Sequence, residues 1–152
     1  MIVNIEFLDH EPIENIISSL HFKFDKTIFF GFSEVIEAKK EITKNFLKKY
    51  CGVKEVSFIC LPEYQLDSIL AAMRKVVEQE LIRKNEVFFE VTGGESLILI
   101  AFGMLAESFK APMHSFEIET QKLIELNREN ITPISEVAPR QHIQLDLDAF
   151  IE

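Results

Sequence analysis

The chain alternates between short apolar runs and longer stretches in which apolar residues recur every three or four positions. The short runs have the length and the β-branched and aromatic content of strands, and they occupy residues 1–8, 26–32, 53–61 and 86–91. The longer stretches have the period of a helix face, and they occupy residues 13–20, 33–50, 66–84 and 96–109. Two further strand-like runs follow at 113–119 and 122–127, with a turn near Thr120 and Gln121 between them. This order predicts an α/β fold in which a parallel sheet carries helices on both faces and ends in an antiparallel edge hairpin.

Two residues indicate where helices begin. Pro12 suits the first turn of the helix at 13–20, because the N–H that proline lacks would have no partner there. Ser33 is placed to cap the helix at 33–50, since a serine side chain can accept a hydrogen bond from the first unpaired N–H groups.

The segment from Glu86 to Lys110 is the most apolar part of the chain. Its strand, Glu86–Val91, has one interior charge, which is typical of a strand covered on both faces, so we expect it near the centre of the sheet. The next helix, Ser96–Phe109, is apolar around most of its circumference and must be buried on two sides. The sheet covers only one of these sides. We therefore expect a second copy of the chain to cover the other, in a homodimer formed through Ser96–Phe109.

A turn with adjacent glycines, Thr92-Gly93-Gly94-Glu95, joins this strand to this helix. Each glycine at a helix start costs about 1 kcal/mol relative to alanine, so something should require them. Glycine allows positive φ or the close approach of another molecule, and free N–H groups at a helix start can bind an anion. A second interpretation stays open, because Thr92 and Glu95 also fit a capping box in which each side chain bonds the other residue's N–H.

The predicted topology places a ligand at one edge of the sheet. In doubly wound sheets, ligands bind beyond the carboxyl ends of the strands, where the strand order reverses. With a Rossmann-like strand order 3-2-1-4-5, that point lies between the first and the fourth strand. The candidate ligand-binding residues come from the loops at this edge: Asp9, His10, Glu11, Phe32, Ser33, Thr92, Gly93, Gly94, Glu95 and Ser96. Among them, Phe32 can stack on a base or belong to the core.

Composition narrows the choice of function. The chain has 152 residues, of which 47% are hydrophobic, and this suits one globular domain. Its formal charge of −9 opposes general DNA or RNA binding, which relies on basic faces. The longest apolar stretch is about half of the ~20 residues that a membrane span requires, and no export signal opens the chain. Because Cys51 and Cys60 form neither a zinc motif nor a disulfide framework, we expect a cytoplasmic protein without membrane attachment.

Residue types that support catalysis or metal binding are few. His10, His21, His114 and His142 are scattered and have no metal-ligand spacing, so we predict no metal and no cofactor. Ser96 has no neighbouring base that could activate it as a nucleophile. The acidic residues near the predicted site more simply stabilise helix starts than serve as paired catalytic carboxylates. We therefore predict no catalytic residue.

The last part of the chain has a different pattern. Ile131–Ser135 and Ala138–Arg140 contain prolines that break regular structure, and the apolar pattern at 145–152 ends without a cap. We interpret residues 1–130 as one domain. Residues 131–152 are then a connector toward a C-terminal effector domain absent from this chain.

The segment Phe88-Phe89-Glu90-Val91-Thr92-Gly93-Gly94, followed by an apolar helix, resembles the strand-turn-helix signature of CARF domains, the CRISPR-associated Rossmann-fold sensors. The tail segments 132–137 and 145–152 are similar to the connector that precedes the nuclease part of CARF effectors in type III CRISPR systems. The resemblance spans the whole chain, and its specific motif is the Thr-Gly-Gly turn.

This resemblance implies a homodimeric sensor that binds a cyclic oligoadenylate, in particular cyclic tetra-adenylate, and controls an attached effector nuclease in antiviral defence. It assigns Thr92, Gly93 and Gly94 to phosphate and ribose contacts, and the loop Asp9–Glu11 to the base or ribose side. Glu95 departs from the family, whose members often have a small polar residue at this position.

Two other functions stay open. A ring nuclease would degrade the same messenger, with the 2′-hydroxyl of the ligand attacking the neighbouring phosphate. A plain dimerisation module would leave the cleft empty and use the glycines only to form the turn.

Overall fold

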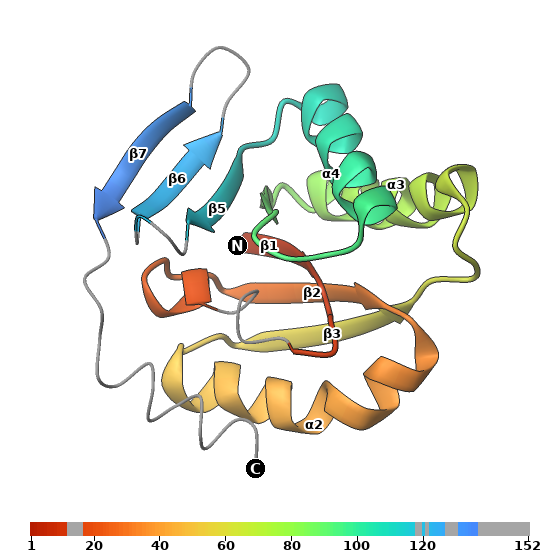
Figure 1. Ribbon diagram of the computed structural model, residues 1–152, viewed down its shortest axis with the longest axis horizontal. Coiled ribbons are helices and arrows are strands. Elements are labelled where there is room, and N and C mark those ends of the chain that lie inside the picture. Colours follow the sequence, from red (N-terminus) through yellow and green to blue (C-terminus); the bar gives the residue numbers. More distant parts are fainter. Residues whose placement is uncertain (12–16, 118–119, 121, 127–130, 137–152) are drawn as a thin grey trace.

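A single seven-stranded sheet forms the centre of the protein (Figure 1). The computed structural model describes residues 1–11, 17–117, 120, 122–126 and 131–136. The strand order is β3-β2-β1-β4-β5-β6-β7. The strands are β1 (Ile2–Phe7), β2 (Lys26–Gly31), β3 (Glu55–Cys60), β4 (Glu86–Glu90), β5 (Met113–Glu117), β6 (Lys122–Leu126) and β7 (Ile131–Glu136). Strands β1 to β5 pair in parallel, and β5, β6 and β7 pair antiparallel, which confirms the predicted fold class.

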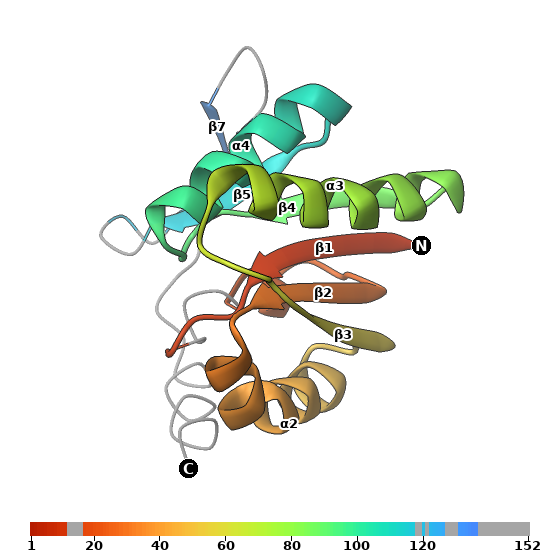
Figure 2. The same cartoon turned by 90° about the vertical axis from the view of Figure 1, so that its right-hand side faces the viewer.

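The helices form layers on both faces of this sheet. Figure 2 shows α3 (Leu66–Ile82) and α4 (Ser96–Phe109) on one face and α2 (Ser33–Tyr50) on the other. The main core lies between the sheet and α3 and α4, and its most buried members include Ile5, Phe7, Ile28, Phe30, Phe89, Ile69, Met73, Ile98, Phe102 and Leu105. A second core lies under α2 and contains Leu8, Phe29, Val35, Ile36, Phe46, Leu47 and Val53.

The central segment folds as its apolar pattern predicts. Strand β4 lies fourth of the seven strands, between β1 and β5, so the expectation of a central strand and the order 3-2-1-4-5 are confirmed. Helix α4 begins and ends at the predicted residues. It buries Ile98 and Phe102 against the sheet, whereas the side chains of Ile100 and Met104 are 49% and 47% exposed. One apolar side of α4 therefore lacks a cover in a single chain.

Three local predictions differ from the structure or lie outside it. The helix predicted at 13–20 is described only from Ile17 to Leu20, which form a 3₁₀ helix, η1; residues 12–16, with the predicted first turn at Pro12, lie outside the described residues. Ser33 is wrong as the cap of α2, because the capping position is Phe32 and no side chain bonds the helix start there. With Ser33 already inside the helix, its hydroxyl cannot take the capping role.

The prediction of irregular structure at Ile131–Ser135 is also wrong. These residues belong to β7, which pairs antiparallel with β6 and places Pro133 opposite Ile124. A register shift between Leu123 and Ile124 accompanies this pairing. Proline is tolerated in an edge strand or beside a bulge, where its missing N–H breaks no ladder bond, so Pro133 did not exclude a strand. The predicted break at Ala138–Arg140 and the segment 145–152 lie outside the described residues.

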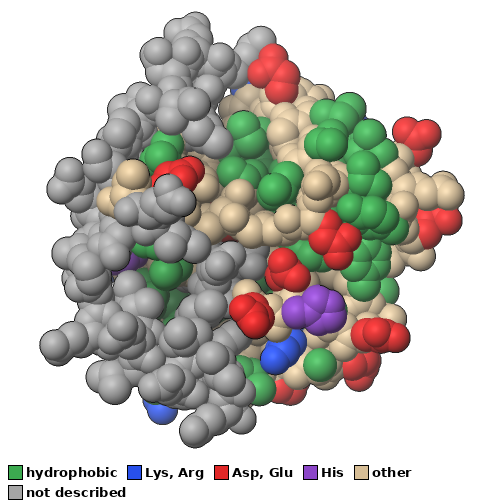
Figure 3. All heavy atoms as spheres, in the orientation of Figure 1, with side chains coloured by type: hydrophobic (Ala, Val, Ile, Leu, Met, Phe, Trp, Pro, Cys, Tyr) green, Lys and Arg blue, Asp and Glu red, His purple; other side chains and the backbone are tan. Residues whose placement is uncertain are grey.

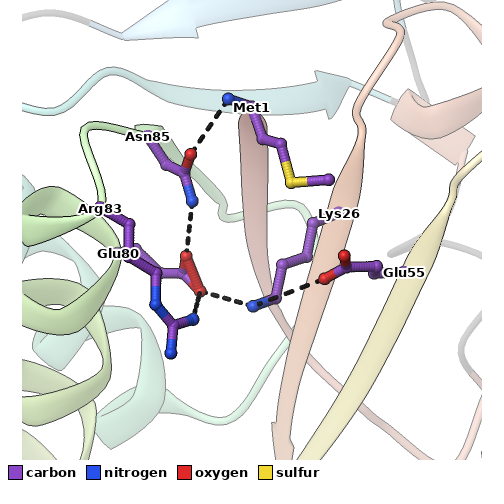
Figure 4. Close-up of polar contacts among 6 residues, drawn as sticks. All are labelled: Met1, Lys26, Glu55, Glu80, Arg83 and Asn85. Atoms are coloured by element: carbon purple, nitrogen blue, oxygen red, sulfur yellow. Dashed lines mark hydrogen bonds and ion pairs between the residues drawn. The ribbon is translucent and has the colours of Figure 1, made fainter.

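A polar network closes the edge of the sheet at the amino ends of β1, β2 and β4 (Figure 4). The Nζ of Lys26 lies 2.6 Å from Oε1 of Glu80, and Asn85 Nδ2 donates to Glu80 Oε2 at 2.9 Å. The N-terminal amine of Met1 donates to Asn85 Oδ1 at 3.0 Å. Burial alone would raise the pKa of Glu80, but the bonds from Lys26 and Asn85 and the charges of Lys26 and Arg83 outweigh it and lower this pKa. This network fixes the edge opposite to the predicted ligand site.

Within the described residues, no helix is both long enough and apolar enough to cross a membrane.

Candidate functional site

A pocket of about 230 Å³ opens at the carboxyl ends of β1 and β2. Its lining comes from the end of β1 and the loop after it, the start of α2, and the residue before α4: Phe7, Leu8, Asp9, His10, Phe32, Ser33, Glu34, Val35 and Glu95. Strand β1 pairs with β2 on one side and with β4 on the other, so the chain order reverses here. The pocket therefore lies at the topological switch point where α/β sheets bind ligands.

The structure brings half of the predicted site residues together in this pocket. Asp9, His10, Phe32, Ser33 and Glu95 line it. The other predicted residues, Glu11, Thr92, Gly93, Gly94 and Ser96, do not line it.

The glycine turn nevertheless lies against the pocket wall. A Cβ placed on Gly94 would lie 3.7 Å from the Cβ of Phe7 and 3.4 Å from the Leu99 side chain. Gly94 has a φ of +139°, which L side chains rarely adopt, so the turn requires glycine at this position. The backbone conformation therefore explains why a glycine that destabilises the helix start is kept at this position. The short distance to Phe7 also shows that the turn lies beside the pocket.

Sequence reasoning missed four residues of the lining. Phe7 and Leu8 end the first strand, and Glu34 and Val35 lie in the first turn of α2. The signal that could have found them was the topology itself, because the carboxyl end of β1 and the start of α2 both lie at the switch point. Apolar residues such as Phe7, Leu8 and Val35 were more readily assigned to the core, and the structure indeed buries all three.

An aromatic group forms one wall of the pocket. The ring of Phe32 lies edge-on to Phe7, with centroids 6.0 Å apart, and edge-on to Tyr64, also at 6.0 Å. The hydroxyl of Tyr64 lies 3.5 Å from the backbone N of Leu97 in the first turn of α4. Phe32 is partly buried against the main core and also borders the pocket, so the two interpretations of this ring are compatible.

The lining of the pocket is acidic. Asp9, Glu34 and Glu95 supply carboxylates, His10 supplies an imidazole, and the described lining contains neither lysine nor arginine. In Figure 3, carboxylates and a histidine gather below the hydrophobic side chains that run along α4. Asp9 Oδ1 accepts a bond from the backbone N of His10 at 2.7 Å, which turns this carboxylate toward its own loop. No lysine or arginine of the described lining is available to an anion, so main-chain N–H groups would have to supply most of its contacts.

The capping-box interpretation of Thr92 and Glu95 is wrong. Glu95 is the residue before α4, in an extended conformation, and no side chain bonds the helix start. The hydroxyl of Thr92 instead accepts the backbone N–H of Phe116 at 2.7 Å, across the sheet in β5. A hydroxyl carries two lone pairs and one hydrogen, so Thr92 keeps a proton that it can donate to a ligand.

Metal chemistry receives no support from this geometry. Across residues 1–11 and 17–117 and the described part of the hairpin, no three His, Cys, Asp or Glu side chains come together as a metal site.

Solved structures share this architecture. The crystal structure of protein VC1899 from Vibrio cholerae matches with a TM-score of 0.78 and 18% identity, over 95% of this chain and 38% of that one. Can2 from Sulfobacillus thermosulfidooxidans, solved in complex with cyclic tetra-adenylate, matches with a TM-score of 0.73 and 13% identity, over 88% of this chain and 37% of Can2. A type III CRISPR defence DNA nuclease activated by cyclic oligoadenylate matches with a TM-score of 0.69 and 19% identity, over 95% of this chain and 23% of the nuclease.

This chain shares the Rossmann-like fold of these proteins. The expected resemblance is thus confirmed for the fold. No protein-family model and no curated protein sequence matches the chain, so the likeness rests on the structure. The chain spans less than two fifths of the length of each of these three proteins. This fold places the pocket, the Thr92 turn and the start of α4 next to one another.

Proposed function

We propose that this chain is a sensor domain that binds a cyclic oligoadenylate across a homodimer formed through α4. The observation that carries this proposal is the apolar side of α4, exposed at Ile100 and Met104, which begins directly after the Thr92-Gly93-Gly94 turn. The folds of Can2, which was solved with cyclic tetra-adenylate, and of a nuclease activated by cyclic oligoadenylate support the choice of ligand.

The exposed side of α4 suits a second copy of the same helix. Ile100 and Met104 are four residues apart and lie on one side of the helix, and a Cβ placed on Gly103 between them would meet no atom within 4 Å. This leaves a flat surface that another helix can approach closely. Complete burial of an isoleucine or methionine side chain contributes about 1.5–3 kcal/mol, and a two-fold interface counts each residue twice. Such a dimer places the starts of both α4 helices, and so both turns, near one axis.

The turn and the helix start supply the groups that a ring of phosphates requires. The first N–H groups of a helix have no partner within it and carry the positive end of the helix dipole. Two such helix starts related by a two-fold axis match a cyclic oligoadenylate, which is a polyanion with rotational symmetry. In this arrangement Thr92, Gly93 and Gly94 contact phosphates and riboses, and the loop Asp9–Glu11 and the ring of Phe32 lie on the base or ribose side. An even ring has the symmetry of the dimer, and among even rings we assign cyclic tetra-adenylate because Can2, with the same fold, was solved with it.

Control of an attached effector belongs to the same proposal. The similar structures extend well beyond the region that this chain matches, since the chain covers 38%, 37% and 23% of them. We propose that residues 131–152 lead toward such an effector and that ligand binding favours one arrangement of the two protomers.

Isothermal titration of the chain with cyclic tri-, tetra- and hexa-adenylate tests the proposal, with linear tetra-adenylate as the matched control. We expect one cyclic tetra-adenylate per two chains and at least tenfold weaker binding of the linear form. Chromatography of the ligand after incubation separates a sensor from a ring nuclease, because only the nuclease yields linear products. A folded, dimeric protein that binds none of the rings would contradict the proposal and leave a plain dimerisation module.

A further inference from the structure

Four polar side chains are buried together on the face of the sheet that α3 and α4 do not cover. Asn4, Glu6 and Glu90 are fully buried and His114 is 2% exposed. They come from the neighbouring strands β1, β4 and β5. Burying ionisable groups costs several kcal/mol each unless they are paired, and apolar residues of similar volume would stabilise this position better. A cluster of this kind at the centre of the sheet therefore calls for an explanation other than stability.

The cluster holds the first residue of the glycine turn. Glu90 Oε1 accepts the backbone N–H of Thr92 at 2.6 Å, and Glu90 Oε2 lies 2.8 Å from Nδ1 of His114. The hydroxyl of Thr92 accepts the backbone N–H of Phe116 at 2.7 Å. Thr92 is thus tied to β4 through its N–H and to β5 through its hydroxyl, and the Glu90–His114 contact joins these two strands beneath it.

Each nitrogen of the His114 imidazole lies close to an oxygen atom of another strand. Its Nε2 lies 3.0 Å from Oδ1 of Asn4 on β1, opposite to the contact with Glu90. Phe24 stacks on the imidazole at 5.5 Å between centroids, and Phe22 lies edge-on to it at 5.4 Å. These rings close the imidazole off from solvent and leave it one orientation.

Burial favours the neutral form of Glu6. Burial, and then the nearby charge of Glu90, raise the pKa of Glu6 well above its usual range, against a smaller opposing effect of Asn4. Glu90 is then the carboxylate of the cluster that lies against the imidazole of His114.

We propose that Glu90 and His114 are positioning residues that fix the Thr92-Gly93-Gly94 turn in the conformation that binds the ligand. This inference rests on the proposed function, because it concerns the same turn. Neither residue reaches the ligand, since both are buried under the sheet face; they act on it through the backbone N–H of Thr92. Glu90 and His114 belong neither to the pocket lining nor to the glycine turn.

Substitutions of the two residues test the proposal against a matched control in the same cluster. We expect Glu90→Gln to weaken binding of cyclic tetra-adenylate at least tenfold and to accelerate hydrogen exchange of the Thr92 amide by a similar factor. Glu6→Gln changes a carboxyl of the same cluster that has no contact with Thr92, and we expect both quantities to stay within twofold of the wild type. His114→Asn keeps a donor near the position of Nδ1 and should retain more affinity than His114→Leu.

Rescue of affinity by a conservative variant is the readout that a merely structural role would not move. His114→Leu removes every polar atom that could contact Glu90, whereas His114→Asn keeps one. Equal affinities of these two variants for cyclic tetra-adenylate, with equal exchange of the Thr92 amide, would overturn the role of His114.

Hydrogen exchange of the Thr92 amide distinguishes a failure of the positioning role from a failure of the proposed sensor function. If the wild type binds no cyclic oligoadenylate, the proposed function fails, but slow exchange of the Thr92 amide that Glu90→Gln accelerates still supports the positioning role. If the wild type binds and Glu90→Gln binds equally well with unchanged Thr92 exchange, the positioning role fails and the sensor function stands. If Glu90→Gln does not fold, comparison of His114→Asn with His114→Leu decides the question.

Discussion

The Nζ of Lys26 lies 2.6 Å from Oε1 of Glu80, and this ion pair joins the first residue of β2 to the last turns of α3. The side chains are 11% and 3% exposed, so water does little to screen the pair. The pair closes the edge of the sheet opposite to the pocket, and it allows a prediction about stability that is independent of any ligand.

Removing one partner of this pair should destabilise the fold strongly. We expect Glu80→Ala to lower the free energy of unfolding by about 3 kcal/mol, because it leaves Lys26 buried without its partner. Urea denaturation followed by circular dichroism measures the change. Glu78→Ala, which removes an exposed glutamate from the same helix, is the matched control and should cost less than about 0.5 kcal/mol. Equal effects of both variants would show that the buried pair contributes nothing.

The Glu80 pair also sets a pH dependence of stability. The pKa of Glu80 is lowered in the folded protein relative to 4.5, so the unfolded chain takes up a proton at a higher pH than the folded one. The stabilisation is therefore complete above the unfolded pKa and is lost as the pH falls through the lower, folded pKa. Urea denaturation of the wild type and Glu80→Ala at several pH values from 7 downward measures this loss, and the difference between the two proteins should shrink below about pH 4.5. A difference that stays constant to low pH would contradict the assignment.

The pH dependence of stability that comes from Glu6 runs in the opposite direction to that from Glu80. Its pKa is raised by burial and by the charge of Glu90, so with rising pH the unfolded chain ionises this carboxyl before the folded protein does. Glu6 therefore destabilises the fold above its unfolded pKa and has no such effect below it. We expect Glu6→Gln to raise the free energy of unfolding by about 1–2 kcal/mol at pH 8 and to leave it nearly unchanged near pH 4. Denaturation midpoints of wild type and variant at the two pH values measure this difference.

The exposed side of α4 predicts the effect of charges placed on it. We expect Ile100→Glu or Met104→Glu to weaken dimerisation by about a hundredfold or more, because the glutamate would be buried unpaired at a two-fold interface. Analytical ultracentrifugation measures the dissociation constant. Ile82→Glu is the control, since Ile82 is 80% exposed at the end of α3 and lies outside the proposed interface. A dimer that persists in both α4 variants would show that the interface does not include this side of α4.

The ring of Phe32 should contribute to affinity through stacking. Stacking of a base on an aromatic side chain is worth about 1–3 kcal/mol, so we expect Phe32→Leu to weaken binding of cyclic tetra-adenylate about fivefold or more. Phe58→Leu is the control, because Phe58 is also half-buried but stacks on Phe29 under α2 and does not line the pocket. Titration calorimetry compares the two variants. Equal losses would indicate that Phe32 serves the core alone.

Local sequence patterns were enough to predict the order of elements, the central place of β4 and the bounds of α4. These features follow from local rules, because the period of apolar residues distinguishes helix from strand and a strand covered on both faces needs a continuous apolar run. The same rules located the edge of the sheet where the pocket lies. Half of the predicted site residues line that pocket, since residues directly after parallel strands must emerge at one edge.

The contacts between polar side chains, in contrast, became known only from the folded chain. Asn4 and His114 are 110 positions apart, and Lys26 and Glu80 are 54 apart, so no local pattern could pair them. Asn4 alternates with the apolar Val3 and Ile5, and this pattern alone predicts that Asn4 faces solvent. In the structure Asn4 is fully buried, because the second face of the sheet is covered as well. The Thr92 hydroxyl likewise accepts the N–H of Phe116 and does not form the expected capping box. Local sequence spacing could not predict this bond, because Phe116 lies on the neighbouring strand, 24 positions away. Local spacing fixes which elements form, whereas the partners of a buried polar group depend on which strands become neighbours.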